Sequence, residues 1–451
     1  MTRTVRWASV LTATTTAGVM AGVMVAATGS AQAAAGPPVP RVVGVDAVVE
    51  VLPEGPVVNA VVLEYDRRVN LRGADLDPAS FDVRVSLNGT VAERTETHAY
   101  VSRSGEPGDE ARNGTFVVVE LAATDPGPGV LTYSGGVNRR NDLEGAYLVD
   151  VVDDVTDNRG RVVLPATGDP VANDDVVRLV VDDFQVRSTT GTSGTTLRYG
   201  MYTPPPARGP QELFPLVVAL HGAGERGTDG TVQLLGNQLA VAFAEPERQA
   251  TDRSIVLAPQ APPPSLQPVP AGLSVWEVPE VQSTLMELVE RTIATQPVDP
   301  DRVYITGLSM GSMGTFDILP RYPDVFAAAL PTTGLADQSA APVLADIPIW
   351  ATHSVDDQTV RYDRDDSDVA VFRTIAALGT PVVFDEWAGN LPDAENEARA
   401  RAQWDAAKAA GAEHLFTTWT AGTTPVNAHF AWVPTYSNAV MLDWLFSHER
   451  D

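Results

Sequence analysis

The sequence predicts two domains, an all-β sandwich followed by an α/β domain whose sheet is mostly parallel. Residues 36–186 contain short Val-rich runs separated by turn residues, which is typical of a sandwich. In residues 187–451, continuous apolar runs alternate with helical segments, which is typical of a parallel sheet flanked by helices. A chain of 451 residues is long enough for two such domains, each with its own core.

The first domain is predicted from five apolar runs that lack helical periodicity. Turn signals such as Asn88-Gly89, Asn113-Gly114 and the Pro-Gly-Pro-Gly run at 126–129 lie between them. We therefore expect strands at residues 42–45, 60–63, 81–85, 116–119 and 146–149.

The second domain is predicted from apolar runs that read as strands buried on both faces. We expect these strands at residues 216–220, 255–258, 303–306, 327–330 and 347–351. Helices are expected at residues 279–295, 312–321, 369–378 and 394–410. Residues 188–196 contain only Ser, Thr and Gly, so they form either a hinge between the domains or the tip of a hairpin. Residues 382–387 and 415–419 are alternatives for the last strand.

Composition excludes several classes of function. The 58 Asp and Glu against 31 Lys and Arg give a net charge of −27, which argues against nucleic acid or an anionic membrane surface as partner. The acids outnumber the bases in both halves, as expected for a solvated surface. The absence of cysteine excludes disulfides, thiolate metal sites and a cysteine nucleophile.

Residues 1–35 are predicted to be a secretory signal peptide. Arg3 and Arg6 precede an uncharged run at 8–28, and Ala31-Gln32-Ala33 is a cleavage pattern. The run is rich in Ala, Thr and Gly, so it is weak as a permanent membrane span. We expect a secreted protein without a membrane anchor after cleavage.

The candidate nucleophile is Ser309, in the sequence Gly307-Leu308-Ser309-Met310-Gly311. A buried strand precedes this G-x-S-x-G pattern and a helix follows it, so the serine is expected on a sharp elbow. A serine hydroxyl needs a base to remove its proton and an acid to orient that base. The last three histidines follow Ser309 far enough along the chain to leave room for an acid, and of these His429 lies in a loop after a strand, where a base is expected. His414 and His448 are expected to be structural or solvated.

Two adjacent carboxylates follow the strand at 347–351 and compete for the role of the acid. These are Asp356 and Asp357, of which we favour Asp357. The expected oxyanion hole consists of the N–H of Met310 and the N–H of Ala223, in the His-Gly-Ala-Gly turn after the strand at 216–220. His221 is expected to brace this turn rather than to act as a base.

Two residues are candidates for the substrate pocket. Gly222 would let the backbone approach a substrate, and Trp276 follows a Pro-rich segment at 259–270 that forms either a pocket wall or a plain surface loop.

Five segments together resemble a known family. Residues 220–227 (LHGAGERG), 256–260 (VLAPQ), 305–311 (ITGLSMG), 353–360 and 429–434 (HFAWVP) resemble secreted α/β-hydrolase esterases often labelled "predicted peptidase". These are similar to polyhydroxyalkanoate depolymerases and to feruloyl or acetyl xylan esterases. Some carry an immunoglobulin-like N-terminal domain, which residues 61–66 (VVLEYD) resemble.

The resemblance implies a serine carboxylic-ester hydrolase with Ser309, Asp357 and His429 as catalytic triad. The family's acid lies four residues after a strand-end histidine, here His353, which favours Asp357. The chain departs from the family in having Ser354 where glycine is usual. The resemblance implies no metal or organic cofactor, and a small-molecule or polymeric ester as substrate; the oligomeric state stays open.

Two other functions remain as alternatives. The first is a serine peptidase on the same fold, and the second is a non-catalytic protein that binds a polymer through its sandwich. Acyl and alcohol specificity depend on loops whose positions the sequence does not predict.

Overall fold

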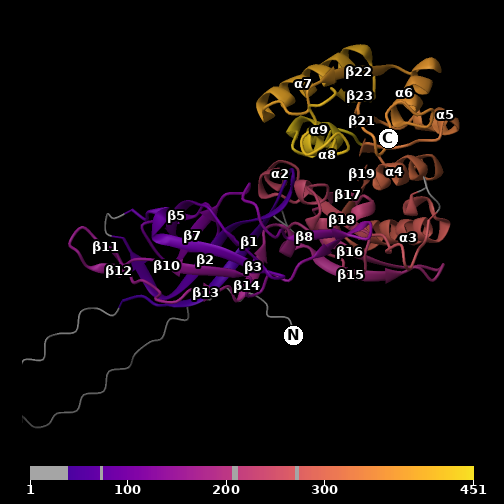
Figure 1. Cartoon of the computed structure of the whole chain (residues 1–451). Helices are drawn as coiled ribbons and strands as arrows, with labels where there is room; N and C mark the ends of the chain where they lie inside the picture. The colour runs from indigo at the N-terminus through magenta and orange to yellow at the C-terminus, as the bar shows by residue number, and fades with distance from the viewer. Residues whose placement is uncertain (1–38, 72–74, 206–211, 270–273, 451) are drawn as a thin grey trace, which may run out of the picture. The chain divides into compact units, whose positions relative to one another are not determined.

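The computed structural model describes residues 39–71, 75–205, 212–269 and 274–450, and it confirms the predicted fold class (Figure 1). A β-rich part comes first, and a mostly parallel sheet with flanking helices follows. The predicted signal peptide, residues 1–35, lies outside the described residues.

The β-rich part is a sandwich of two main sheets. One has six strands in the order β14-β1-β2-β7-β5-β6, and the other has four in the order β13-β10-β3-β4. Alternate residues of both sheets, such as Val45 and Ala47 in β1 and Val83 in β3, enter one core, as the period-two pattern requires. The strands are β1 (Val42–Leu52), β2 (Gly55–Asn70), β3 (Phe81–Leu87), β4 (Thr90–Glu93), β5 (Glu96–Ser102), β6 (Glu110–Ala111), β7 (Asn113–Leu121), β8 (Leu131–Ser134), β9 (Val137–Arg140), β10 (Tyr147–Val151), β11 (Val155–Thr156), β12 (Val162–Leu164), β13 (Val171–Ala172) and β14 (Asp175–Arg178).

The second part is built on one nine-stranded sheet with the order β15-β16-β18-β17-β19-β20-β21-β23-β22. The pairings β15–β16 and β16–β18 are antiparallel, whereas every pairing from β18 to β22 is parallel. The strands are β15 (Gln185–Thr190), β16 (Thr196–Tyr202), β17 (Phe214–Leu220), β18 (Ile255–Gln260), β19 (Val298–Leu308), β20 (Ala328–Thr332), β21 (Ile349–Ser354), β22 (Val382–Trp387) and β23 (His414–Trp419).

Helices cover both faces of this sheet. Leu216 and Val218 of β17 enter a core shared with α3, α4 and α6, whereas Val217 and Ala219 enter the core that α8 and α9 share. Figure 1 shows α3, α4 and α6 on one side of the strands and α8 and α9 on the other. The helices are α1 (Val232–Leu235), α2 (Pro246–Thr251), α3 (Pro279–Thr295), α4 (Met310–Arg321), α5 (Ala341–Leu344), α6 (Asp368–Ala377), α7 (Asp393–Ala410), α8 (Trp432–Tyr436) and α9 (Ala439–Phe446).

The structure decides between two pairs of alternatives left open above. Residues 188–196 span the tip of the β15–β16 hairpin, and β15 already belongs to the nine-stranded sheet from Gln185. Both candidate last strands exist: β22 is the edge strand, and β23 lies between β21 and β22. The chain therefore leaves β23, not β22, when it enters the loop that carries His429.

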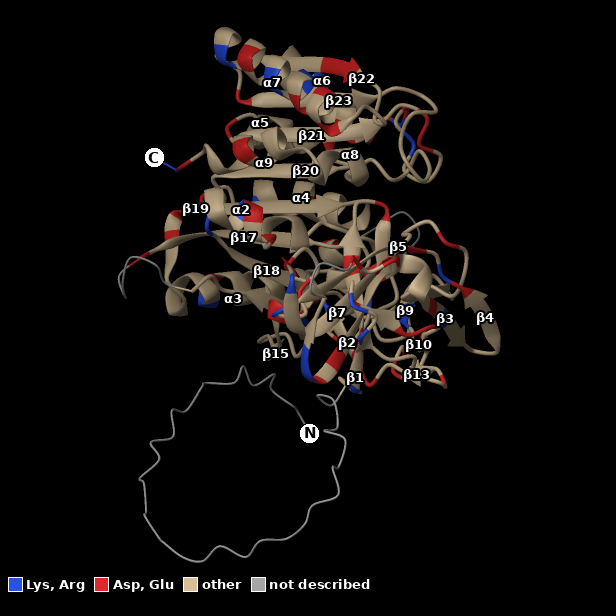
Figure 2. Cartoon of the chain, turned by 90° about the vertical axis from the view of Figure 1, so that its left-hand side faces the viewer, with Lys and Arg blue, Asp and Glu red and all other residues tan. Residues whose placement is uncertain are grey.

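Acidic residues are spread over both parts of the chain, and Figure 2 shows their positions on the ribbon interspersed with the fewer basic ones. Within the described residues, no helix is both long enough and apolar enough to cross a membrane.

Candidate active site at the carboxyl ends of the parallel strands

Three of the predicted site residues follow neighbouring parallel strands. Ser309 comes directly after β19, Asp357 lies three residues after β21, and His429 lies in the loop after β23. The carboxyl ends of parallel strands meet at one edge of a sheet, and β19, β20, β21 and β23 are consecutive neighbours. The order of the strands thus brings together residues that are far apart in the chain.

Ser309 lies on a strained elbow between β19 and α4. Its backbone angles are φ 51° and ψ −117°, a region that residues with a side chain rarely adopt. Its N–H donates to the Thr332 carbonyl at 3.0 Å, which holds the elbow against β20. The strain leaves the half-buried side chain at the sheet edge, next to the N-terminus of α4.

The two glycines of the G-x-S-x-G pattern are required by close backbone contacts. A Cβ at Gly311 would lie 1.8 Å from the Leu220 carbonyl oxygen, and one at Gly307 would lie 2.4 Å from the Gly311 carbonyl oxygen. No side chain fits at either position, so the sequence pattern follows from how tightly α4 packs on β17 and β19.

Ser309, His429 and Asp357 form one hydrogen-bonded path. The Oγ of Ser309 lies 3.0 Å from the Nε2 of His429, and the Nδ1 of His429 lies 2.7 Å from the Oδ2 of Asp357. The His429 ring also meets the Trp432 ring edge to face, with centroids 5.3 Å apart. An Nδ1–H held by a carboxylate leaves Nε2 free to accept a proton from the serine.

The structure brings Asp357, and not Asp356, to His429. Asp357 is 2% exposed, and its Oδ1 accepts hydrogen bonds from the N–H groups of Thr359 and Val360 at 2.7 and 3.0 Å. Asp356 points to the neighbouring loop, where its Oδ2 accepts from the Gly422 N–H at 2.8 Å. The two adjacent carboxylates therefore hold different loops.

A buried histidine lies behind the Asp357 carboxylate. His353, at the end of β21, has its Nε2 3.5 Å from Asp357 Oδ2 and its Nδ1 2.6 Å from Asp368 Oδ1. Burial acts to raise the pKa of Asp357, but the contacts with His353 and His429 outweigh it and hold that pKa far below its usual range. The Asp357 carboxylate is thus ionised near pH 7.

The turn after β17 is held by His221, as expected. This ring is buried; its Nδ1–H donates to the Gly222 carbonyl at 2.6 Å, and its Nε2 accepts from the Ala261 N–H at 2.9 Å. Burial lowers the pKa of His221 to about 4, so the ring is neutral near pH 7 and acts as a brace. Ala223, by contrast, is exposed at the start of the following short 3-10 helix, Ala223–Glu225.

Glu225 is a buried carboxyl in the same turn. Its Oε1 accepts a hydrogen bond from Asn138 Nδ2 at 3.0 Å, and its side chain packs against Gly222 and Gly236. Burial raises the pKa of Glu225 to about 7. The turn that carries the expected oxyanion donor, the Ala223 N–H, therefore packs against a titratable carboxyl group, that of Glu225.

The structure does not place Trp276 on a pocket wall. Its side chain is 0% exposed, its indole N–H donates to the His221 carbonyl at 3.2 Å, and a Cβ at Gly314 would lie 2.3 Å from its own Cβ. The short 3-10 helix Val275–Glu277 turns the side chain inward under α4. The indole N–H therefore has its hydrogen-bond partner inside the core. Gly222 is likewise buried, with Leu308 against its backbone.

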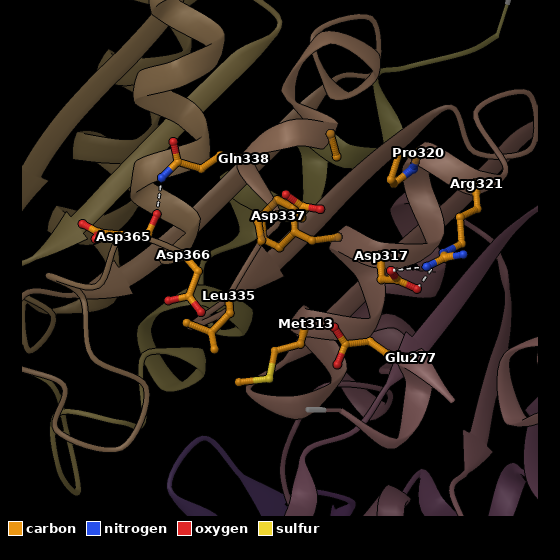
Figure 3. A pocket seen from close by; sticks show the side chains of 13 residues that line it. Glu277, Met313, Asp317, Pro320, Arg321, Leu335, Asp337, Gln338, Asp365 and Asp366 are labelled. Atoms are coloured by element: carbon orange, nitrogen blue, oxygen red, sulfur yellow. Dashed lines mark hydrogen bonds and ion pairs between the residues drawn. The ribbon is translucent and has the colours of Figure 1, made fainter. Parts of the chain in front are cut away.

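A cavity of about 590 Å³ lies along α4, and Ser309, His429 and Asp357 are not among the residues that line it. Figure 3 shows Asp317 and Arg321 pointing toward one another on one wall, where the guanidinium Nε lies 2.9 Å from the carboxylate. Across the cavity, the Gln338 side chain donates to the Asp365 carbonyl. In the part of the chain that the structure describes, no group of three His, Asp or Glu side chains is arranged to hold a metal ion.

Sequence reasoning missed three residues: Glu225 supports the turn after β17, Trp432 packs on His429, and Asp368 holds His353. Glu225 and Trp432 lie within segments 220–227 and 429–434, which carry the family resemblance, so the sequence marked both positions. What each side chain does is visible only from its place in the fold. Asp368 lies 15 residues after its partner His353, at the first position of α6, where an acid is common at any helix N-terminus. No pattern in the sequence distinguishes it.

Comparison with known proteins agrees with this architecture. Residues 44–164 match the family described as the esterase Ig-like N-terminal domain. A solved structure, described as a thermostable esterase, superposes with a TM-score of 0.76 at 29% identity and covers 91% of this chain and 100% of that one.

Two curated proteins are similar over shorter stretches. Poly(3-hydroxyalkanoate) depolymerase C of Paucimonas lemoignei is 43% identical over 51 residues, which are 11% of this chain and 12% of that protein. The bifunctional acetylxylan esterase/xylanase XynS20E of Neocallimastix patriciarum is 25% identical over 95 residues, which are 21% of this chain and 14% of that protein. The matches thus span less than a sixth of either relative.

These likenesses confirm that the chain combines an immunoglobulin-like N-terminal domain with an α/β-hydrolase domain of the esterase type. They also support the prediction of a hydrolase of the carboxylesterase class.

Proposed function

We propose that this chain is an exported carboxylic-ester hydrolase in which Ser309 forms an acyl-enzyme. The observation that carries the proposal is the path from Ser309 Oγ to His429 Nε2 at 3.0 Å and from His429 Nδ1 to Asp357 Oδ2 at 2.7 Å. The likeness to a thermostable esterase over 91% of the chain supports an ester as substrate. The names of the two curated relatives, a depolymerase and an acetylxylan esterase, point the same way.

In the first half of the reaction, His429 Nε2 removes the Ser309 hydroxyl proton while Oγ attacks the ester carbonyl carbon. The carbonyl oxygen becomes an oxyanion, for which the N–H groups of Met310 and Ala223 are the proposed donors. His429 then carries a positive charge, which the buried Asp357 carboxylate stabilises. Transfer of the proton from His429 to the alcohol oxygen releases the alcohol and leaves the acyl group on Ser309.

In the second half, a water molecule replaces the alcohol. His429 removes a proton from the water as the oxygen attacks the acyl carbonyl, and the same donors stabilise the second oxyanion. The proton then returns to Ser309 Oγ, and the carboxylic acid leaves. The strained elbow at Ser309 requires no rearrangement for either step, because its hydroxyl already lies within hydrogen-bond distance of the base.

Export is proposed from residues 1–35 alone. The charged start, the small apolar run and the Ala31-Gln32-Ala33 pattern support removal of this segment on secretion. When the full chain is expressed in a secreting host, the protein should be found in the culture medium. N-terminal sequencing should show that it begins shortly after Ala33. Retention of residues 1–35 in the active protein would contradict export by this route.

The test of the activity is the Ser309→Ala variant of the full chain on p-nitrophenyl acetate. We expect kcat to fall by about 10⁴-fold or more, because the nucleophile is lost. A fluorophosphonate should add to the wild-type chain at Ser309, as read by peptide mass spectrometry, and should not add to the variant. Ser312→Ala is the matched control, since Ser312 is buried on the same helix and should leave both readouts unchanged.

Two outcomes would contradict the proposal. Wild-type hydrolysis by Ser309→Ala would exclude this serine as nucleophile, and peptide p-nitroanilides cleaved faster than p-nitrophenyl esters would favour a peptidase. Absence of any turnover, together with retention on a polyester or xylan resin, would favour a binding protein. A chain-length series of p-nitrophenyl esters with methyl ferulate and a polyester film would then define the acyl range.

A further inference from the structure

His353 is a completely buried residue with a carboxylate on each side. Its side chain and those of Asp357 and Asp368 are each 0% exposed. Nδ1 lies 2.6 Å from Asp368 Oδ1, and Nε2 lies 2.9 Å from the Val360 carbonyl oxygen and 3.5 Å from Asp357 Oδ2. Tyr362 is a further titratable neighbour, and its ring meets the imidazole edge to face with centroids 5.5 Å apart.

The partners of His353 favour a proton on both ring nitrogens. A carbonyl oxygen can only accept, so Nε2 must donate to Val360. The Asp368 carboxylate already accepts from the N–H groups of Gly334 and Val369, each at 2.8 Å, so it too acts as an acceptor toward Nδ1. An imidazole that donates from both nitrogens is a cation. Burial alone would lower the pKa of His353, but its two carboxylate neighbours outweigh burial and raise it to about 10.

This cation is aimed at the oxygen of Asp357 that faces His429. Asp357 Oδ2 accepts from His429 Nδ1 at 2.7 Å and lies 3.5 Å from His353 Nε2, whereas Oδ1 is held by backbone N–H groups. A buried carboxylate without such support would gain from taking up a proton, which would remove the acceptor that His429 needs. The contacts of His353 are with Asp368, Val360, Asp357 and Tyr362, so its route to the aligned side chains passes through Asp357.

We infer that His353, held by Asp368, is a positioning residue for the triad acid: it keeps the Asp357 carboxylate charged and directed at His429. The inference rests on the proposed function of Ser309, His429 and Asp357. The path thus runs from Asp368 through His353, Asp357 and His429 to Ser309. The last three form the proposed triad, and the first two determine the charge next to its acid.

The charge-neutral double variant His353→Asn with Asp368→Asn tests this role. It removes both members of the His353–Asp368 ion pair, so neither of these two charges is left buried without its partner. In the full chain we expect kcat on p-nitrophenyl acetate to fall about 10- to 100-fold, with KM unchanged within about twofold. The acid limb of the kcat/KM profile should move up by about half to one pH unit, because the cation that is removed lies next to Asp357, whereas the anion removed with it lies on the far side of His353.

His414→Asn is the matched control, since His414 is a buried histidine of β23 whose Nε2 bonds only a backbone carbonyl, that of Leu344, at 3.0 Å. It should lower stability to a similar degree and leave the pH profile in place. Active-site titration with a fluorophosphonate corrects each rate for the folded fraction.

A second measurement leaves His353 and both of its carboxylate partners in place. In nitrogen-edited NMR of the Ser309→Ala chain, the His353 ring, assigned through its contacts with Tyr362, should stay doubly protonated at pH 8. A neutral His353 at that pH, or a double variant with the wild-type kcat and pH profile, would overturn the inference. Wild-type activity of Ser309→Ala would instead overturn the proposed function, so the two failures are distinguishable.

Discussion

His429 Nε2 and Ser309 Oγ lie 3.0 Å apart although 120 residues separate them in the chain. The contact exists because β19 and β23 end at the same edge of one parallel sheet. Each histidine nitrogen has one partner, so the orientation of the ring is determined from both sides.

The two adjacent carboxylates should differ in their effect on activity. Asp357→Asn should lower kcat by about 10³- to 10⁴-fold, because an amide can hold the wrong tautomer of His429. Asp356→Asn is the matched control: it changes the same charge one residue away, where Oδ2 bonds only the Gly422 N–H, and should cost less than about threefold. Steady-state kinetics on p-nitrophenyl acetate measure both. A larger loss for Asp356→Asn would reassign the acid.

Gly311→Ala should destabilise the protein by at least about 3 kcal/mol. The new Cβ would lie 1.8 Å from the Leu220 carbonyl oxygen and 2.9 Å from that of His221, so either α4 or β17 must move. Gly129→Ala is the control, since a Cβ there makes only an ordinary contact of 3.6 Å with the Leu131 carbonyl oxygen. Chemical denaturation compares the two. Equal midpoints for both variants would show that the contact at Gly311 is relieved without cost.

Glu225→Gln should stabilise the protein at alkaline pH. The folded-state pKa of Glu225 is about 7 and its unfolded value is 4.5, so the unfolded state binds fewer protons between these values. Stability therefore falls as pH rises from 4.5 to 7, and the glutamine removes this loss. We expect the variant to be more stable by roughly 1 to 3 kcal/mol at pH 8 and nearly unchanged at pH 4. Urea titrations at the two pH values measure this, and an equal difference at both would refute burial as the cause.

Trp276→Phe should change stability and leave substrate preference alone. The indole is buried and donates to the His221 carbonyl at 3.2 Å, so its loss removes volume and leaves that carbonyl without a partner. We expect a cost of about 1 to 3 kcal/mol. The ratio of kcat/KM for acetyl and butyryl p-nitrophenyl esters should not move by more than about twofold. A clear change in that ratio would return Trp276 to the substrate pocket.

Much of the fold could be predicted because its signals are local. The run at 279–295 corresponds to α3 (Pro279–Thr295), and the expected strand at 216–220 lies within β17 (Phe214–Leu220). Such segments can be predicted because burial on one face of a helix, or on both faces of a strand, produces a pattern of apolar residues close together in the sequence. The place of β22 at the edge was not predicted, because strand order depends on contacts between segments that sequence spacing does not record.

The sequence by itself determined which chemistry is available, because Gly307-Leu308-Ser309-Met310-Gly311 places the nucleophile and both glycines of the elbow within five consecutive residues. Only the tertiary structure decided which carboxylate meets His429, that Trp276 turns into the core, and that Asp368 holds His353. Those outcomes depend on the direction of single side chains and on the desolvation of charges, and both arise only when distant segments pack together.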